Sequence, residues 1–209
     1  MQIEASALAL ERGGRIIFTN LGFSLSDGQA LVVTGPNGAG KSSLLRALAG
    51  LLPFAAGRIA VTPGGSGLSE HSHYVGHADA LKPSLTVYEN LEFWAALLGR
   101  ADTPPADPVV QIEMALARLG LARIADLPAA YLSAGQKRRA ALARLLAVRR
   151  PLWLLDEPAT ALDAASQKVL AEVMLAHLAD GGMIIAATHA PLGLPARELV
   201  LGGTNGGAA

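Results

Sequence analysis

Residues 30–42 read ALVVTGPNGAGKS, in which a short apolar run leads directly into a glycine-rich turn. The apolar run predicts a buried strand, and the leucines after the turn recur at helical spacing, at Leu44, Leu45, Leu48, Leu51 and Leu52. The turn from Gly35 to Ser42 matches G-x-x-x-x-G-K-[ST] between a strand and a helix, which is the context that this pattern requires. The stretch therefore predicts an α/β fold with a phosphate-binding loop.

The residue types of this turn suit the binding of ATP and Mg²⁺. Glycines let backbone N–H groups converge on a phosphate, and the helix N-terminus adds a favourable dipole. Lys41 supplies a compact positive charge for the β- and γ-phosphates, and Ser42 supplies an oxygen for Mg²⁺. The alternative is a purely structural turn, which the flanking strand and helix disfavour. The expected contacts with the nucleotide are Gly35, Pro36, Asn37, Gly38, Ala39, Gly40, Lys41, Ser42 and Ser43.

Strands and helices alternate along the rest of the chain. Apolar runs at 151–155 and 183–188 predict buried strands, and the helical pattern returns at 134–149 and 166–179. Because buried apolar strands that alternate with helices are typical of parallel sheets, we expect a mostly parallel sheet in one α/β domain. The expected parts of this domain are a core (1–77 and 132–200, with strands and turns over 1–30), a helical insertion (78–131, with helices over 86–100 and 108–121 and the linker 101–108) and a disordered tail (201–209).

Composition excludes several classes of protein. The 209 residues carry 17 basic and 17 acidic side chains, so the neutral chain has no electrostatic footprint for nucleic acid. Cysteine is absent, which excludes disulfides, and the N-terminus lacks the pattern of a secretory signal. No apolar run is long enough to cross a membrane. The mean hydropathy of +0.37 fits either a subunit docked on an apolar partner or an alanine-rich composition.

Two acidic residues, Asp156 and Glu157, follow the predicted strand 151–155. The carboxyl end of a parallel strand faces the crevice where phosphates bind in open α/β sheets. We expect Asp156 to hold Mg²⁺ through a water and Glu157 to take the proton of the attacking water as a general base. The alternative is a strand end with two solvated acids, which is less expected beside a phosphate loop.

Residues 132–136, LSAGQ, open the predicted helix 134–149, where Ser133 is a good N-cap. With the phosphate loop and the acidic pair, this motif resembles the nucleotide-binding subunit of ABC transporters over nearly the whole chain. The resemblance implies a phosphate-loop NTPase core, an N-terminal antiparallel β portion and an inserted helical subdomain. It also implies an ATP-dependent head-to-tail homodimer, in which the LSAGQ residues Ser133, Gly135 and Gln136 bind the γ-phosphate held by the opposite subunit.

Two further positions match this family. Asp163 ends Ala161-Leu162-Asp163, six residues after Glu157, and the resemblance places it at the dimer seam. His189 follows the predicted strand 183–188 and resembles the switch histidine that contacts the γ-phosphate and orients water. A lone histidine after a strand is otherwise most often structural.

Three of the five histidines lie at His71, His73 and His77, which would share one face of a strand. A three-histidine metal site is therefore one alternative. In the family a glutamine that touches Mg²⁺ and water stands about eight residues before Leu85-Thr86, and His77 occupies that place here. We expect neutral His77 to hydrogen-bond in a similar way and to make coupling to partners sensitive to pH near about 6–7.

The N-terminal region also departs from the family. An aromatic residue that stacks on adenine usually precedes the glycine turn, where this chain has Glu11-Arg12-Gly13-Gly14. The guanidinium plane of Arg12 can stack instead.

Within the family, the chain resembles the ATPase subunit of the haem exporter of bacterial cytochrome c biogenesis. The matching segments are ERGG, the GH before the insertion, LSAGQKRRAALARL and GGMIIAATHAPLGL. The resemblance implies a peripheral subunit on the cytoplasmic face of the inner membrane, docked on integral membrane subunits near Lys82-Pro83-Ser84 and Trp94. A periplasmic haem chaperone would be only an indirect partner. Another ABC importer or exporter ATPase, and a soluble ABC protein without transport function, are the alternatives.

Overall fold

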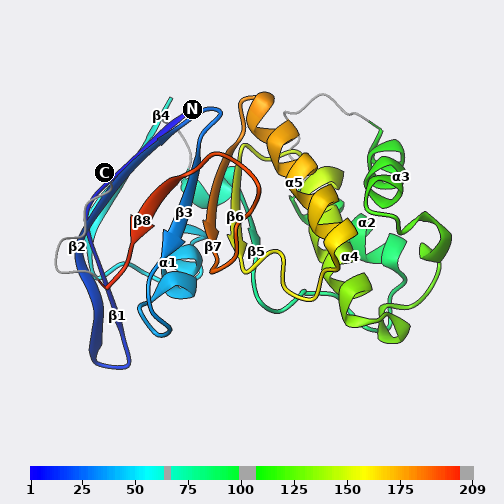
Figure 1. Cartoon of the computed structure of the whole chain (residues 1–209), viewed down its shortest axis with the longest axis horizontal. Coiled ribbons are helices and arrows are strands. Elements are labelled where there is room, and N and C mark those ends of the chain that lie inside the picture. Colours follow the sequence, from blue (N-terminus) through cyan, green and yellow to red (C-terminus); the bar gives the residue numbers. More distant parts are fainter. Residues whose placement is uncertain (64–66, 99–106, 203–209) are drawn as a thin grey trace. The chain divides into compact units, whose positions relative to one another are not determined.

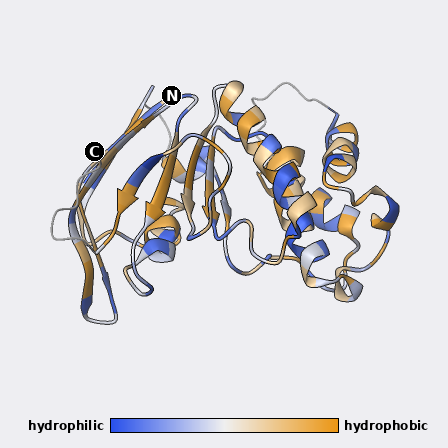
Figure 2. Ribbon diagram, in the orientation of Figure 1, coloured by the Kyte–Doolittle hydropathy of each residue, from blue (hydrophilic) through white to orange (hydrophobic). Residues whose placement is uncertain are grey.

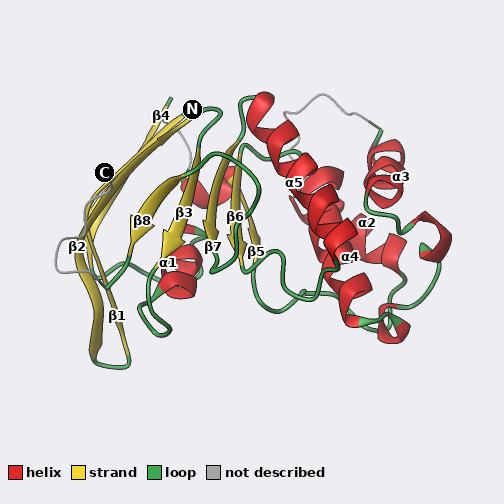
Figure 3. Ribbon diagram, in the orientation of Figure 1, coloured by secondary structure: helices red, strands yellow, loops and turns green. Residues whose placement is uncertain are grey.

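The strands of the described residues form two sheets, whose pairing is set by their hydrophobic patterns (Figures 1 and 3). The computed structural model describes residues 1–63, 67–98 and 107–202. A five-stranded sheet has the order β5-β6-β7-β3-β8, and all of its paired strands run parallel. Its strands are β3 (Ala30–Thr34), β5 (Ser72–Val75), β6 (Leu152–Asp156), β7 (Met183–Ala187) and β8 (Arg197–Val200). The predicted parallel sheet is therefore confirmed.

The second sheet is antiparallel and has the order β2-β1-β4. Its strands are β1 (Gln2–Arg12), β2 (Arg15–Ser26) and β4 (Ala56–Thr62). A tight turn joins β1 to β2, and both of its residues, Gly13 and Gly14, have positive φ values of 58° and 73°. Only glycine adopts this conformation readily, so the pair allows a two-residue hairpin. The predicted N-terminal antiparallel portion is confirmed.

The chain divides into two compact units. Unit 1 comprises residues 1–76, 150–157 and 173–209, and unit 2 comprises residues 77–149 and 158–172. Unit 1 holds every strand named above, whereas unit 2 is helical in the part that the structure describes (Figure 3). The expected helical insertion lies within unit 2, which also takes in the helix after LSAGQ.

The helices of the chain lie close to their predicted positions. They are α1 (Lys41–Leu48), α2 (Val87–Leu98), α3 (Pro108–Arg118), α4 (Ala134–Ala147) and α5 (Ala164–Ala179), with short 3₁₀ helices over Leu68–His71, Ala122–Ile124 and Ala129–Tyr131. Most of the linker predicted at 101–108, and the tail predicted at 201–209 except Leu201 and Gly202, lie outside the described residues.

Helix α1 is shorter than the leucine pattern predicts. It ends at Leu48 because Gly50, with φ 77°, leaves the helix in the left-handed conformation. The Gly50 and Leu51 N–H groups donate to the carbonyls of Ala47 and Arg46, at 3.0 and 2.8 Å, which is the Schellman arrangement. Leu51 and Leu52 therefore lie beyond the helix, and Leu51 is exposed.

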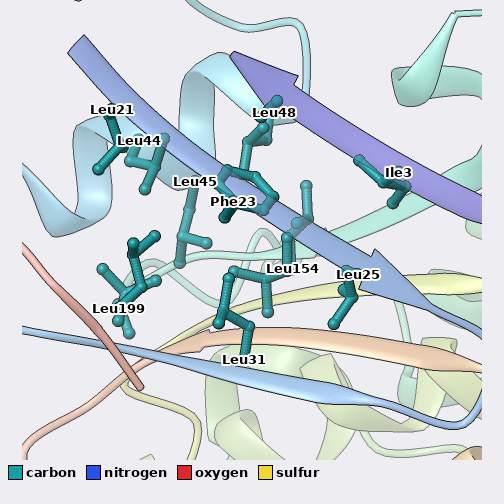
Figure 4. Close-up of a cluster of buried hydrophobic side chains, with 14 of the residues drawn as sticks. Ile3, Leu21, Phe23, Leu25, Leu31, Leu44, Leu45, Leu48, Leu154 and Leu199 are labelled. Carbon is teal, nitrogen blue, oxygen red and sulfur yellow. The ribbon is translucent and has the colours of Figure 1, made fainter. Parts of the chain in front are cut away.

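The core of unit 1 lies between the antiparallel sheet, α1 and one face of the parallel sheet (Figure 4). Leu44, Leu45 and Leu48 of α1 are fully or almost fully buried in it. Both β6 and β7 are buried at every position and are hydrophobic along most of their length (Figure 2). This burial fixes the loop at the start of α1 against the carboxyl ends of the parallel strands.

The core of unit 2 lies among α2, α3 and α4, where apolar side chains such as Leu91, Ile112 and Leu142 are buried. Buried Asn90 on α2 binds the preceding loop, since its side chain donates to the carbonyls of Lys82, Leu85 and Thr86 at 2.8–3.2 Å. None of the helices in the described residues is both long enough and apolar enough to cross a membrane.

Candidate functional site

The phosphate loop runs from the end of β3 to the start of α1. Three of its glycines have positive φ values, 132° at Gly35, 84° at Gly38 and 101° at Gly40. A Cβ at Gly35 would lie 2.3 Å from the Leu201 carbonyl oxygen, whereas a Cβ at Gly38 would meet nothing within 4 Å. Gly35 is therefore required for packing within the protein, while the space beside Gly38 is open to a ligand.

Lys41 is the first residue of α1, and only 9% of its surface is exposed. Its ammonium group donates to the carbonyl oxygens of Gly35 at 2.8 Å and Pro36 at 3.1 Å. These bonds satisfy a buried charge that would otherwise be costly, and they hold the charge over the loop. An ammonium group so placed can bind phosphate oxygens that enter the loop.

Ser42 and Asp156 meet at the carboxyl end of β6. The Ser42 hydroxyl donates to Asp156 Oδ1 at 2.9 Å, and Asp156 is 3% exposed. Hydroxyl and carboxylate oxygens are the donors that Mg²⁺ prefers. The two residues therefore fit a magnesium ion in chemistry, with Asp156 placed beside Ser42 where it can hold the ion through a water.

Glu157 is brought together with Thr188 and His189, which follow β7. The Thr188 hydroxyl donates to Glu157 Oε2 at 3.2 Å, and His189 Nε2 lies 3.9 Å from Glu157 Oε1. Glu157 has a φ of 47°, an uncommon conformation for a residue other than glycine, and its N–H donates to the Ala187 carbonyl at 2.8 Å. A partly exposed carboxylate can accept a proton from a water molecule, and an imidazole beside it can orient that water.

Arg12 lies at the exposed tip of the β1–β2 hairpin, where it pairs in register with Arg15. Ile17 of β2 lies against the phosphate loop, since a Cβ at Gly40 would come within 2.3 Å of Ile17 Cγ2. No local sequence pattern indicates this contact, because it depends on how β2 packs against the loop.

The LSAGQ motif forms a capping box at the start of α4. The Gln136 N–H donates to the Ser133 hydroxyl at 3.3 Å, and the Ser133 N–H donates to Gln136 Oε1 at 2.8 Å. The predicted N-cap is confirmed, and Gln136 has a structural partner in addition to its expected role at the nucleotide.

We predict that substitutions at Ser133 change stability through the loss or retention of the cap. Ser133→Ala removes the cap and should lower the free energy of unfolding by about 0.5–2 kcal/mol. Ser133→Asn keeps a capping oxygen and should unfold within about 0.5 kcal/mol of the wild type, because asparagine is an equally good N-cap. Urea unfolding measures both values, and equal stability of Ser133→Ala and the wild type would contradict the cap.

Gly135 and Asp163 belong to neighbouring segments of unit 2. A Cβ at Gly135 would lie 3.0 Å from the Ala161 carbonyl oxygen, so glycine lets the two segments approach closely. Asp163 precedes α5 and accepts a hydrogen bond from the Ser166 N–H at 2.8 Å. Hydrogen bonds from Ser166 lower the pKa of the Asp163 carboxyl, which favours its ionised form at neutral pH. Asp163 therefore caps α5 in addition to its expected place at a dimer seam.

The three-histidine metal site is wrong. Only His73 lies on β5, where it is buried, while His71 ends a 3₁₀ helix and His77 is exposed after the strand. Across residues 1–63, 67–98 and 107–202, no group of three or more histidine, aspartate or glutamate side chains is placed to hold a metal ion. His77 is the first residue of unit 2.

The glycine before His77 is explained by Tyr74. A Cβ at Gly76 would lie 2.8 Å from the Tyr74 hydroxyl oxygen. Arg46 of α1 donates to this oxygen through Nε at 3.3 Å, and the bond raises the pKa of the Arg46 guanidinium. The sequence offered no sign of this link between α1 and the residues before His77, because it spans 28 positions.

Comparisons with known proteins agree with this geometry. The model of the ABC transporter family matches residues 18–160. A protein named cytochrome c biogenesis ATP-binding export protein CcmA from Nitrobacter winogradskyi is 54% identical, over 97% of this chain and 99% of that protein. The protein of the same name from Rhodopseudomonas palustris strain BisB18 is 56% identical over the same shares.

The fold is also found among solved structures. The structure of an ATP binding subunit of an ABC transporter superposes with a TM-score of 0.85, covers 96% of this chain and 86% of that chain, and is 23% identical. The chain therefore belongs to the ABC transporter family as an ATP-binding ATPase subunit, among the cytochrome c biogenesis export proteins named CcmA.

Proposed function

We propose that ATP hydrolysis by this chain drives the haem-export step of cytochrome c biogenesis, in which a haem-loaded periplasmic chaperone is released. The observation that carries this proposal is the identity of 54–56% to export proteins of cytochrome c biogenesis over nearly the full length. The described residues suit ATP hydrolysis, and the names of the relatives support a role in export for cytochrome c biogenesis, whereas haem as the cargo is part of the proposal itself.

At the site within one subunit, Lys41 and the loop N–H groups bind the β- and γ-phosphates of ATP. Ser42 and Asp156 would hold Mg²⁺, which neutralises charge on the phosphate oxygens when it is bound. Glu157 accepts the proton of the attacking water, and His189 orients that water and contacts the γ-phosphate. The support for these last roles is the contact of both side chains at 3.9 Å and their partial exposure.

The site is completed by a second copy of the chain in a head-to-tail dimer that forms with ATP. Ser133, Gly135 and Gln136 of one subunit bind the γ-phosphate held by the other, at the N-terminus of α4. Asp163 lies at the seam between the subunits. These roles are supported by the exposure of Ser133 and Asp163 and by the close approach of Gly135 to Ala161.

The membrane partners dock on unit 2 from the cytoplasmic side of the inner membrane. Residues 82–84 are exposed, as are Phe93 and Leu97 of α2. Trp94 is less available for contact with a partner, since Arg144 lies over its ring at 4.6 Å and its indole N–H donates to the Ala80 carbonyl. Exposed apolar side chains on one helix favour contact with an apolar partner surface.

The test of the proposed function is the covalent haem content of c-type cytochromes in source cells that carry Lys41→Ala. We expect c-type haem to be lost while b-type haem stays normal, because only haem attachment needs this ATPase. Lys168→Ala, an exposed lysine of α5, is the matched control. Unchanged c-type haem, with the variant at normal levels, would assign this ATPase to a different ABC complex.

His77 provides a separate prediction about coupling to the membrane partners. We expect His77→Ala to lower partner-stimulated ATPase activity and His77→Gln to keep it, because the glutamine side chain can make hydrogen bonds similar to those of a neutral imidazole. The measurement is the ATPase activity of the membrane complex, with His71→Gln as the control. If both variants at position 77 behave like the wild type, His77 does not have the glutamine's role.

A further inference from the structure

Arg138 is a buried arginine that contacts two segments of unit 2. It lies on α4, five residues after Ser133, and its side chain is only 4% exposed. Its Nε donates to the Pro158 carbonyl at 3.2 Å, and its Nη1 pairs with Asp79 Oδ1 at 3.3 Å. Burial of a guanidinium is costly unless such partners are held in place.

Pro158 and Asp79, two partners of Arg138, adjoin residues to which the proposed function gives roles in hydrolysis and in coupling. Pro158 directly follows Glu157, and Asp79 lies two residues after His77. One planar guanidinium therefore fixes the distance between the backbone after Glu157 and the segment after His77.

Glu157 needs support from both sides. Its φ of 47° is a conformation that persists only when the surrounding structure holds it. On one side, its own N–H is bound to the Ala187 carbonyl at 2.8 Å. On the other side, the buried residue Pro158 has no N–H to donate, and its carbonyl oxygen is held by Arg138.

The segment after His77 is held in a similar way. Asn90 of α2 fixes the loop around Lys82 to Thr86, and Arg138 fixes Asp79 at the start of the same loop. The segment is thereby anchored to both α2 and α4, and Arg138 links it to the Pro158 carbonyl.

We propose that Arg138, paired with Asp79, is a positioning residue that sets the geometry of Glu157 and couples it to the His77 segment. The proposal rests on the proposed roles of Glu157 and His77. Arg138 acts through these residues and has no contact with the nucleotide in this role.

The test compares kcat, KM and the Kd for ATP in the full-length subunit. Arg138→Met removes both donors, Arg138→Lys keeps the charge without the planar fork, and Asp79→Ala removes one acceptor. We expect Arg138→Met to lower kcat by about tenfold to a hundredfold, since small misplacements of reacting groups have effects of this size. KM and Kd should change by less than about twofold, because the phosphate loop is untouched. The kcat of Arg138→Lys should lie between that of the wild type and that of Arg138→Met.

The proposal also requires that the effects of substitutions at Arg138 and Asp79 on kcat depend on each other. The kcat of the combined variant Arg138→Met/Asp79→Ala should be no lower than that of Arg138→Met, because both changes break the same link. The matched control is Arg144→Met, which removes a second buried arginine of the same helix that lies over Trp94. Its kcat per folded subunit should equal that of the wild type.

Three results would overturn the proposal. These are a normal kcat per folded subunit in Arg138→Met, an equal loss in Arg144→Met, or effects at Arg138 and Asp79 that simply multiply. If Arg138→Met does not fold, Arg138→Lys and Asp79→Ala decide by the same criteria. Glu157→Gln in the same assay distinguishes failure of the proposed role of Glu157 from failure of the proposed role of Arg138. Wild-type turnover in Glu157→Gln would refute the role of Glu157 itself. Slow turnover in Glu157→Gln together with a normal kcat in Arg138→Met would refute only the role of Arg138.

Discussion

Glu157→Gln is expected to lower ATP turnover by about 10²–10⁴-fold, the usual contribution of a positioned general base. Glutamine has the same shape but cannot accept a proton from water. Its amide oxygen can still accept the hydrogen bond that Thr188 donates at 3.2 Å, so the loop should keep its conformation. ATP binding should persist, and the dimer with ATP should accumulate because hydrolysis no longer opens it.

The measurements are single-turnover hydrolysis and the molar mass in solution with and without ATP. Glu198→Gln is a closely matched control, because Glu198 also accepts a hydrogen bond from a threonine, Thr34, at 2.6 Å. Its turnover should equal that of the wild type. Rapid hydrolysis by Glu157→Gln would remove Glu157 from the role of base.

Lys41→Ala is expected to weaken ATP binding by about thirtyfold to several thousandfold. Truncation of one partner of a buried charged pair typically costs about 2–5 kcal/mol, and about 1.4 kcal/mol corresponds to a factor of ten. In the absence of ATP the ammonium group is held by the carbonyls of Gly35 and Pro36, so the variant also frees two acceptors in the loop. Turnover should fall with affinity.

Equilibrium binding of ATP, followed by calorimetry, measures this loss. Lys168→Ala makes the same change in net charge on an exposed face of α5 and should bind ATP with wild-type affinity. Circular dichroism of both variants shows whether the fold is retained. A folded Lys41→Ala protein with wild-type affinity would contradict the proposed role of the loop lysine.

The local pattern of the sequence was sufficient to place the motifs on their elements. The phosphate loop, the cap at Ser133 and the strands β3, β6 and β7 could be predicted because each depends on neighbouring residues or on a run of apolar side chains.

The tertiary structure decided the features that join distant parts of the chain. Strand β8 has four residues, and its place beside β3 depends on a pairing between Leu31 and Arg197 that no local pattern contains. The helix α1 ended earlier than its leucines predicted, because Gly50 adopts a left-handed conformation.

In the candidate site, too, some features follow from the local sequence and others only from the tertiary structure. Sequence determined which chemical groups are present, since a phosphate loop, an acidic pair and LSAGQ each have a characteristic composition and spacing. Only folding decided that Ser42 meets Asp156 across 114 positions, and that Arg138 meets Asp79 across 59. The physical reason is that helix and strand periodicity reflect local backbone geometry, whereas these contacts depend on the order of strands and the packing of helices.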